Sequence, residues 1–319
     1  MNRKYILGID TSNYKTSIAV TDDNQSVICD LRRFLKVKQG EKGLRQSDAL
    51  FQHVKNIPEM MEELRSRFDG EFHAVAYSSK PRPCEGSYMP VFLAGESFAR
   101  SLAAALCIPV TDFSHQEGHI EAIRAFSGFK DENHFMACHF SGGTTELLDV
   151  TSNGCRYNIE IIGGSKDISF GQVIDRAGVL LGMEFPAGEE LDAVAVSANS
   201  ASSGLTPIKV RNAQINLSGI DTQLKRLLET EKRIDTSMII RELFEKISDA
   251  MAGMIIQGAD ISGVRKVIMA GGVSSSIFIR ASLKDKLDAA GITAEFNDGG
   301  LSQDNAVGTA LLGGKSIWR

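Results

Sequence analysis

Hydrophobic residues are arranged in two ways along the first third of the chain. Three short runs rich in apolar residues are separated by small polar turns, which is typical of an antiparallel meander. From residue 48 onwards, apolar residues recur mostly at intervals of three and four, which predicts a helix. The predicted elements are strands at 6–10, 17–21 and 27–31, a helix from 48, a strand at 73–77, a helix at 92–106 and a strand at 108–111.

The second part of the chain repeats this opening. Its first strand–turn–strand, at residues 139–150, can be aligned in style with residues 8–20, which indicates a duplication. Longer amphipathic stretches follow, and they predict helices. The predicted elements are strands at 135–140, 146–150 and 157–162, helices at 170–182, 188–198 and 238–258, and a closing βαβα section at 264–318.

Length and composition narrow the class of protein. The 319 residues suit two domains of roughly 150 residues each, and 43% hydrophobic with 24% charged residues is typical of a soluble globular protein. No apolar run approaches the ~20 residues of a membrane helix. The start of the chain lacks the apolar stretch of a secretory signal, so we expect a cytoplasmic protein without membrane contact. Five cysteines without a Cys-x-x-Cys pair are expected to be reduced thiols.

The charge distribution gives a weaker signal. A net charge of −5 argues against a protein that coats nucleic acid nonspecifically. Six Lys and Arg residues nevertheless gather between residues 32 and 45. A solvated face explains this cluster more simply than a phosphate-binding patch, and both interpretations stay open.

Three turns rich in small residues carry the first candidate chemistry. Two lie between strands, at 11–16 and 141–145, and the third, at 270–274, joins a strand to a helix. Glycine permits close approach and positive φ, and exposed N–H groups with Ser and Thr hydroxyls can bind phosphate. One Gly-Gly turn alone is more often structural. Three together favour a nucleotide held between two lobes.

A pair of histidines carries the second candidate chemistry. Ser114 suits an N-cap, so His115 and His119 are expected one turn apart on one helix face, a spacing that suits one metal ion. Glu117 does not directly follow the first histidine, so the pattern is not that of zinc proteases. Two histidines at this spacing often arise by chance, and a third ligand is needed. Asp304 could supply it, or could simply cap the last helix.

Taken together, these motifs resemble one family. The chain reads His-Gln-Glu-Gly-His at 115–119, Ser-Gly-Gly-Thr-Thr at 141–145, Met-Ala-Gly-Gly-Val at 269–273 and Asp-Asn-Ala at 304–306. The set resembles the catalytic subunit of tRNA threonylcarbamoyladenosine synthase, from about residue 7 to 313. That family belongs to the superfamily of sugar kinases, heat-shock chaperones and actin. It transfers a threonylcarbamoyl group from its adenylate to N6 of adenosine 37 in tRNA, with partner proteins assisting.

The resemblance implies an α/β fold of two duplicated, actin-like or ribonuclease-H-like lobes with a nucleotide cleft between them. The expected lobes are residues 1–106 and residues 107–319, the second with a helical insertion around 165–260. It also implies a transferase that uses ATP or the threonylcarbamoyl-adenylate and one iron or zinc ion. Its expected partners are tRNA and a homologous subunit. We do not expect a protease, since no Ser–His–Asp arrangement is readable in the sequence.

The resemblance also assigns site residues by position. The expected metal ligands are His115, His119 and Asp304. The expected nucleotide-binding residues are Ser141, Gly142, Gly143, Thr144, Thr145, Gly171, Asp175, Gly188, Gly271, Gly272 and Ser276. Thr144 stands where the family has histidine, and Ser276 where it usually has asparagine. The expected catalytic residues are Thr11, Ser12 and Lys15 of the first hairpin.

The departures from the family pattern concentrate on the acceptor side. The family reads Thr-Ser-Cys-Asp-Glu-Thr where residues 11–16 read Thr-Ser-Asn-Tyr-Lys-Thr, so Tyr14 and Lys15 replace two acidic residues. Residues 80–88 are longer and more polar than the family's Gly-Pro-Gly loop. These changes indicate a diverged paralogue.

Three functions are therefore compared. The first is threonylcarbamoyl or carbamoyl transfer to tRNA, and the second is the same nucleotide chemistry with a small-molecule or protein acceptor. The third is a non-catalytic nucleotide-binding partner subunit. A binding protein could lose its metal ligands, so the retained histidines and Asp304 favour an enzyme.

Overall fold

The computed structural model describes residues 3–12, 14–36, 44–199, 204–230, 235–296, 300–301 and 305–318. The chain divides into two compact units. Unit 1 comprises Met1–Asp131, Ser152–Asn158 and Gln303–Arg319, and unit 2 comprises Glu132–Thr151 and Ile159–Ser302. The lobes expected from the sequence, residues 1–106 and 107–319, are kept as a proposal. No helix within the described ranges is long and apolar enough to cross a membrane.

Unit 1 is built on a five-stranded sheet in the order β3-β2-β1-β4-β5. Its strands are β1 (Tyr5–Thr11), β2 (Lys15–Asp22), β3 (Val27–Phe34), β4 (Phe72–Lys80) and β5 (Val110–Ser114). The first three strands pair antiparallel, which confirms the predicted meander. β4 pairs in parallel with β1, and β5 in parallel with β4.

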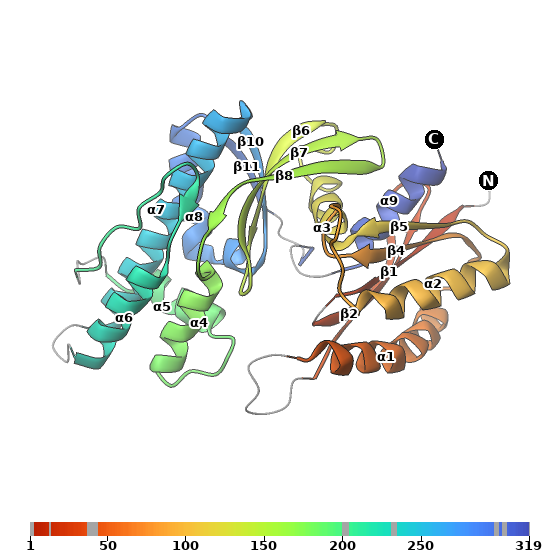
Figure 1. Ribbon diagram of the computed structural model, residues 1–319, viewed down its shortest axis with the longest axis horizontal. Helices are drawn as coiled ribbons and strands as arrows, with labels where there is room; N and C mark the ends of the chain where they lie inside the picture. Colours follow the sequence, from red (N-terminus) through yellow and green to blue (C-terminus); the bar gives the residue numbers. More distant parts are fainter. Residues whose placement is uncertain are drawn as a thin grey trace. The chain divides into compact units, whose positions relative to one another are not determined.

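Helices cover both faces of this sheet, with α1 and α2 on one side and α3 and α9 on the other (Figure 1). Their bounds are α1 (Gln46–Arg67), α2 (Phe92–Leu106), α3 (His115–Arg124) and α9 (Val307–Ile317). Successive side chains of a strand point to opposite faces. On β1, Leu7 and Ile9 belong to a core cluster that includes residues of α1 and α2, whereas a Cβ on Gly8 would lie 2.5 Å from the carbonyl oxygen of Ala306. Asp10 therefore faces the side of α9 and α3.

Helices α3 and α9 cross at a point that leaves no room for a side chain. A Cβ on Gly308 would lie 1.8 Å from the carbonyl oxygen of Gly118, and a Cβ on Gly118 would lie 2.8 Å from Oγ1 of Thr309. Glycine at both positions lets the two backbones touch. Because Gly118 and Gly308 lie in the first turn of their helices, the crossing brings the two helix starts together.

Unit 2 contains a six-stranded sheet in the order β11-β10-β6-β7-β8-β9. Its strands are β6 (His134–Phe140), β7 (Thr145–Asn153), β8 (Arg156–Ser165), β9 (Gln214–Ile215), β10 (Lys266–Ala270) and β11 (Thr293–Phe296). The run β8-β7-β6-β10-β11 has the order of β3-β2-β1-β4-β5 in unit 1. The antiparallel β6–β7 pair and the parallel pairs of β10 with β6 and β11 match it as well, which supports the predicted duplication.

The helices of unit 2 include one that the sequence pattern does not predict, α6. They are α4 (Phe170–Leu180), α5 (Gly188–Ser197), α6 (Ser218–Thr230), α7 (Thr236–Ser262), the short 3-10 helix η1 (Gly272–Ser275) and α8 (Ile277–Ala289). The start of α6 is stabilised by a residue distant in the sequence. The Asp167 carboxylate accepts from the N–H groups of Leu217 and Ser218, each at 2.9 Å. Burial disfavours the charged form of Asp167, yet these donors hold its pKa well below the ordinary value.

A buried histidine joins α1 to the turn between β1 and β2. His53 has no exposed surface, and its Nε2 lies 2.8 Å from the carbonyl oxygen of Ser12. Because a carbonyl only accepts, Nε2 carries the proton, and Nδ1 accepts from the hydroxyl of Thr16 at 2.9 Å. Burial lowers the pKa of His53 from 6.5 to about 4, so the ring is neutral in the folded protein at pH 7.

The free energy of unfolding is expected to fall as the pH drops from 6.5 towards 4. In that range His53 binds a proton in the unfolded chain but not in the folded protein. The contribution of His53 to the free energy of unfolding, which is fully present above pH 6.5, is therefore lost at up to about 1.4 kcal/mol per pH unit. Urea unfolding of the His53→Gln variant should give lower stability at pH 7 and a flatter pH dependence. His134→Gln, which changes an exposed histidine, is the control. Equal pH slopes for wild type and His53→Gln would contradict this assignment.

Candidate functional site

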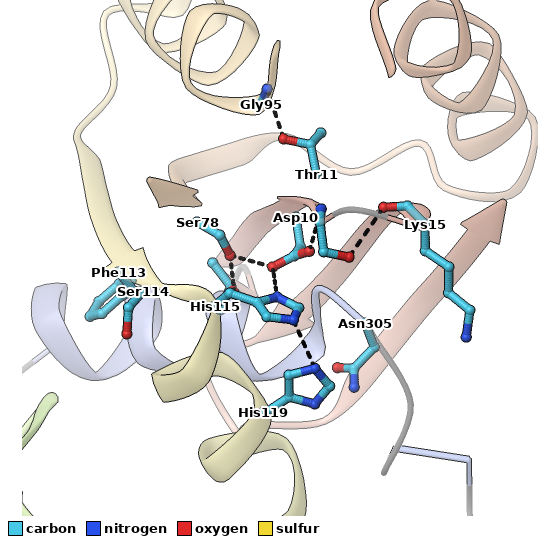
Figure 2. Close-up of polar contacts among 12 residues, drawn as sticks. Asp10, Thr11, Lys15, Ser78, Gly95, Phe113, Ser114, His115, His119 and Asn305 are labelled. Carbon is cyan, nitrogen blue, oxygen red and sulfur yellow. Dashed lines mark hydrogen bonds and ion pairs between the residues drawn. The ribbon is translucent and has the colours of Figure 1, made fainter. Parts of the chain in front are cut away.

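A buried carboxylate and two histidines form a chain of contacts in unit 1 (Figure 2). Oδ2 of Asp10 lies 2.7 Å from Nδ1 of His115, and Nε2 of His115 lies 3.0 Å from Nε2 of His119. Asp10 is 1% exposed, so this contact is shielded from water. Both histidines lie on α3 one turn apart, as the sequence predicts.

The start of α3 is held by local and tertiary contacts. The hydroxyl of Ser114 accepts from the N–H of Glu117, whose carboxylate accepts from the N–H of Ser114, so the two form a capping box. Glu121 lies one turn further along the same side of α3, and its Oε1 is 2.6 Å from Nζ of Lys315. Burial raises the pKa of Tyr157, and its phenol donates to Glu121. These contacts occupy the side of α3 that the two histidines leave free.

The two ring nitrogens are suitably placed to hold one metal ion. Nitrogens 3.0 Å apart can both lie within about 2.1 Å of one ion, the usual Zn–N distance. A carboxylate on the second ring nitrogen, as at His115, is common among metal-binding histidines. The side chains present therefore fit a transition metal.

The third expected ligand, Asp304, lies outside the described residues. Its neighbour Asn305 is buried, and its side-chain oxygen accepts from the N–H of Val307, the first residue of α9, at 3.0 Å. The chain beside Asp304 thus leads directly into the helix that crosses α3. Within the described part of the chain, no three His, Cys, Asp or Glu side chains form a complete metal site.

The turn after β1 carries Thr11 and Ser12, two of the expected catalytic residues. The hydroxyl of Thr11 donates to the carbonyl oxygen of Val91 at 3.0 Å and accepts from the N–H of Gly95 at 3.2 Å, so it faces α2. The N–H of Ser12 donates to Oδ1 of Asp10 at 3.1 Å. The structure thus brings Ser12 to Asp10. Thr11 instead points to Gly95 on α2, on the opposite face of the sheet (Figure 2).

Lys15, the third expected catalytic residue, lies at the start of β2. Its Nζ is 4.3 Å from the centre of the Phe34 ring, an attractive cation–π contact. Lys15 pairs with Phe34 in the register of β2 and β3, which explains the contact. Tyr14, the other replacement of an acidic residue, is half-exposed. The catalytic roles of Thr11, Ser12 and Lys15 stay predictions.

In unit 2 the expected phosphate-binding residues 141–145 form a tight turn between β6 and β7. The N–H of Ser141 donates to the carbonyl oxygen of Thr144 at 2.8 Å, and the N–H of Thr144 donates to the hydroxyl of Ser141 at 3.1 Å. Gly142 and Gly143 are exposed at the tip. A Cβ on Gly143 would meet no atom of the described residues within 4 Å.

The first turn of α4 packs directly against this glycine tip. The hydroxyl of Ser169 donates to the carbonyl oxygen of Gly142 at 2.6 Å, and the N–H of Phe170 donates to Oγ1 of Thr145 at 3.0 Å. A Cβ on Gly171 would lie 2.5 Å from Cα of Gly142. Glycine at 171 is therefore needed for the helix to reach the turn.

Asp175 follows one turn later on α4. Its Oδ1 accepts from the N–H of Ala187 at 3.0 Å, immediately before Gly188 starts α5. A Cβ on Gly142 would lie 3.9 Å from Oδ2 of Asp175, so this carboxylate is close to the glycine tip. Burial raises the pKa of Asp175 above the ordinary aspartate value.

The third glycine turn adjoins the end of β6. Gly271 has a φ of +91°, which favours glycine, and a Cβ there would lie 2.3 Å from the carbonyl oxygen of Phe140. A Cβ on Gly272 would meet only open space within the described structure. Ser276 caps α8 by accepting from the N–H of Ile279 at 3.1 Å. The expected nucleotide-binding residues of the three segments thus come together around one end of β6.

Two carboxylates that the sequence motifs do not single out hold these sites. Asp10 contacts His115 and Ser12, as described above. Asp192 on α5 accepts from the hydroxyl of Ser276 at 2.5 Å and from the N–H of Ile277 at 2.7 Å, so it supports the start of α8. The available signal was an acidic residue among apolar ones. Asp10 is the next-to-last residue of the apolar strand β1, and Asp192 follows Leu191 on the buried side of α5.

Solved structures share this fold. Full-length HypF in its phosphate- and nucleotide-bound form matches with a TM-score of 0.64 at 15% identity, covering 98% of this chain and 56% of HypF. A ROK family glucokinase from Streptomyces griseus, in complex with glucose and AMPPNP, matches with a TM-score of 0.54 at 11% identity, covering 98% of this chain and 99% of the kinase. The chain therefore has the same α/β fold as these proteins, as the sequence predicts.

Sequence relatives identify the family. The tRNA N6-adenosine threonylcarbamoyltransferase of Neorickettsia sennetsu is 27% identical over 312 residues, covering 96% of this chain and 92% of the relative. An enzyme of the same name from Thermus thermophilus is 28% identical over 326 residues, covering 100% of this chain and 93% of the relative. The model of the TsaD family matches residues 36–311. This protein therefore belongs to the TsaD family of tRNA N6-adenosine threonylcarbamoyltransferases.

Proposed function

We propose that this protein transfers a threonylcarbamoyl group from its adenylate to N6 of an adenosine in tRNA. The observation that carries the proposal is the meeting of three glycine-bearing segments with Asp175 in unit 2 of a TsaD family member. Because tRNA is the acceptor, we propose a cytoplasmic location. A homologous partner subunit is proposed from the family resemblance alone.

The phosphates of the adenylate bind at the turn of residues 141–145. Gly142 and Gly143 expose backbone there, and glycine lets a phosphate approach N–H donors closely. The N-terminus of α4 begins at the same turn, and a helix N-terminus favours an anion. Asp175 offers carboxylate oxygens suited to the ribose hydroxyls, and the turn at Gly271 and Gly272 receives the adenosine.

His115, His119 and Asp304 would hold an iron or zinc ion. When bound, such an ion neutralises phosphate charge and polarises a carbonyl oxygen. The protein's own contribution is to keep two imidazoles on one side of a helix whose start is capped and whose other side is buried. The role of Asp304 rests on the family pattern.

A second candidate function is transfer to a different acceptor. Its basis is Lys15, a buried cation at the start of β2 that stands where the family has an acidic residue. A cation at this position suits an acceptor that carries a carboxylate or a phosphate, such as a small molecule or a modified protein.

The metal assignment predicts about one transition-metal ion per purified chain. His115→Ala should lose this ion, because two remaining ligands seldom hold it. His134→Ala, which removes an exposed histidine bonded to Asp149, should retain it. Elemental analysis of the three proteins measures the effect, and equal metal content in His115→Ala and wild type would refute the site.

The nucleotide assignment predicts that Gly143→Val and Gly272→Val each lower ATP affinity at least about tenfold, or about 1.4 kcal/mol. A Cβ at either position enters open space, so the fold should survive while the side chain occupies room that the nucleotide needs. Gly219→Val on α6, also directed into open space, is the matched control. Calorimetry measures the affinities, and unchanged binding would mean that the turns are only structural.

The acceptor assignment predicts that this protein restores N6-threonylcarbamoyladenosine in cells depleted of their own threonylcarbamoyltransferase. Mass spectrometry of digested tRNA measures the product. The double variant Tyr14→Asp, Lys15→Glu, which restores the family pattern, should perform at least as well. A wild type that binds ATP and metal but leaves tRNA unmodified would contradict the proposal. Success of the double variant alone would then favour the second candidate, and failure of both a non-catalytic subunit.

A further inference from the structure

The side chain of Asp10 contacts both His115, a proposed metal ligand, and the backbone of Ser12 in the turn between β1 and β2, which is here called the transfer turn. Figure 2 shows Asp10 beside His115. Its Oδ1 accepts from the N–H of Ser12 at 3.1 Å, and its Oδ2 lies 2.7 Å from Nδ1 of His115. The hydroxyl of Ser78, on β4, also donates to Oδ2. With 1% of its surface exposed, Asp10 makes these contacts away from water.

The contact with Asp10 decides which nitrogen of His115 carries the ring proton. A carboxylate is an acceptor, so Nδ1 of His115 is the N–H that donates to it, and Nε2 keeps its lone pair. That lone pair faces Nε2 of His119, 3.0 Å away. A metal ion needs this tautomer, because Nε2 is the atom on the side of the second histidine.

Asp10 is itself held from two further directions. β1 alternates its faces, so Asp10 points to the side covered by α3 and α9, whereas Thr11 points to α2. Ser78, which donates to Asp10, also lies 3.3 Å from Oγ1 of Thr309 on α9. The carboxylate of Asp10 is thus held by Ser78 of β4 and His115 of α3, and Ser78 in turn contacts α9.

We propose that Asp10 is a positioning residue for the transfer reaction, an inference that rests on the proposed function. It orients the ring of His115 so that Nε2 faces the metal, and with its other oxygen it holds the backbone of Ser12 at the start of the transfer turn. Metal position and turn position are therefore set by the two oxygens of one carboxylate.

Asp10→Asn tests this with almost no change in shape. An asparagine that keeps its oxygen on the N–H of Ser12 presents its NH2 to His115, so Nδ1 must accept and the proton moves to Nε2. In metal-free protein, two-bond 1H–15N spectra of the histidine rings should show His115 protonated at Nδ1 in wild type and at Nε2 in Asp10→Asn. Zn2+ affinity, measured by competition with a chelator, should fall about 10–100-fold.

Asp22→Asn is the matched control. Asp22 is also buried, in the same sheet, and its Oδ1 accepts from the N–H groups of Asn24 and Ser26 at 3.0 and 2.8 Å. Asp22→Asn should lose stability as Asp10→Asn does but keep the wild-type Zn2+ affinity and the wild-type tautomer of His115. A purely structural role for Asp10 would make the two variants alike.

Two results would overturn the inference. One is His115 protonated at Nε2 in wild type, and the other is Zn2+ affinity in Asp10→Asn within twofold of wild type. If wild type binds no Zn2+, the proposed metal site fails, while the ring spectra still decide whether Asp10 sets the tautomer. If Asp10→Asn does not fold, Ser78→Ala replaces it. Removing the donor to Oδ2 should lower Zn2+ affinity severalfold, whereas the Asp22→Asn control should keep the wild-type affinity.

Discussion

The direct backbone contact between α3 and α9 is the constraint on which unit 1 depends. Any side chain at Gly308 would collide with the carbonyl oxygen of Gly118, so the helices meet only because both positions are glycine. The contact lies in the first turn of each helix. The first turn of α3 carries His115, and α9 begins three residues after Asp304 in the sequence. The contact also seats both helices on the face of β1 that carries Gly8 and Asp10.

The same need for close backbone approach shapes unit 2. Gly171 lets α4 reach the tip at Gly142, and Gly271 lets the third turn reach the end of β6. Gly143 and Gly272 are different, since a Cβ added at either position would meet no atom of the described residues within 4 Å. Gly171 and Gly271 are therefore needed for the backbone to pack, whereas Gly143 and Gly272 leave space next to the turns. This division is why the two kinds of substitution are expected to act differently.

Polar side chains hold the transfer turn of unit 1 from both sides of the sheet. The N–H of Ser12 donates to Asp10, and the carbonyl oxygen of Ser12 accepts from His53. Asp10 and His53 are both buried, and a buried polar group without a hydrogen-bond partner is costly. Both contacts therefore hold the backbone of Ser12 in place. The turn between β1 and β2 is thus connected to α3 through Asp10 and to α1 through His53.

The sequence by itself determined what depends on near neighbours. The hydrophobic periodicity predicted the meander and the helices that follow it, and Ser114 predicted the start of α3. The four-residue spacing of His115 and His119 placed them on one face of that helix, because helix geometry is local. Motif spacing also identified the family. It did not predict α6, whose start is held by Asp167, a residue 50 positions earlier.

Only the tertiary structure decided which distant groups meet. Asp10 reaches His115 across 105 residues because β1 turns that side chain towards α3, and Lys15 reaches Phe34 through the register of two strands. The alternation of side chains along β1 directs Thr11 to α2, although Thr11 adjoins Ser12 in the motif. These pairings depend on sheet order and helix crossing, which arise from the packing of the whole unit and are not encoded in any short stretch of the chain.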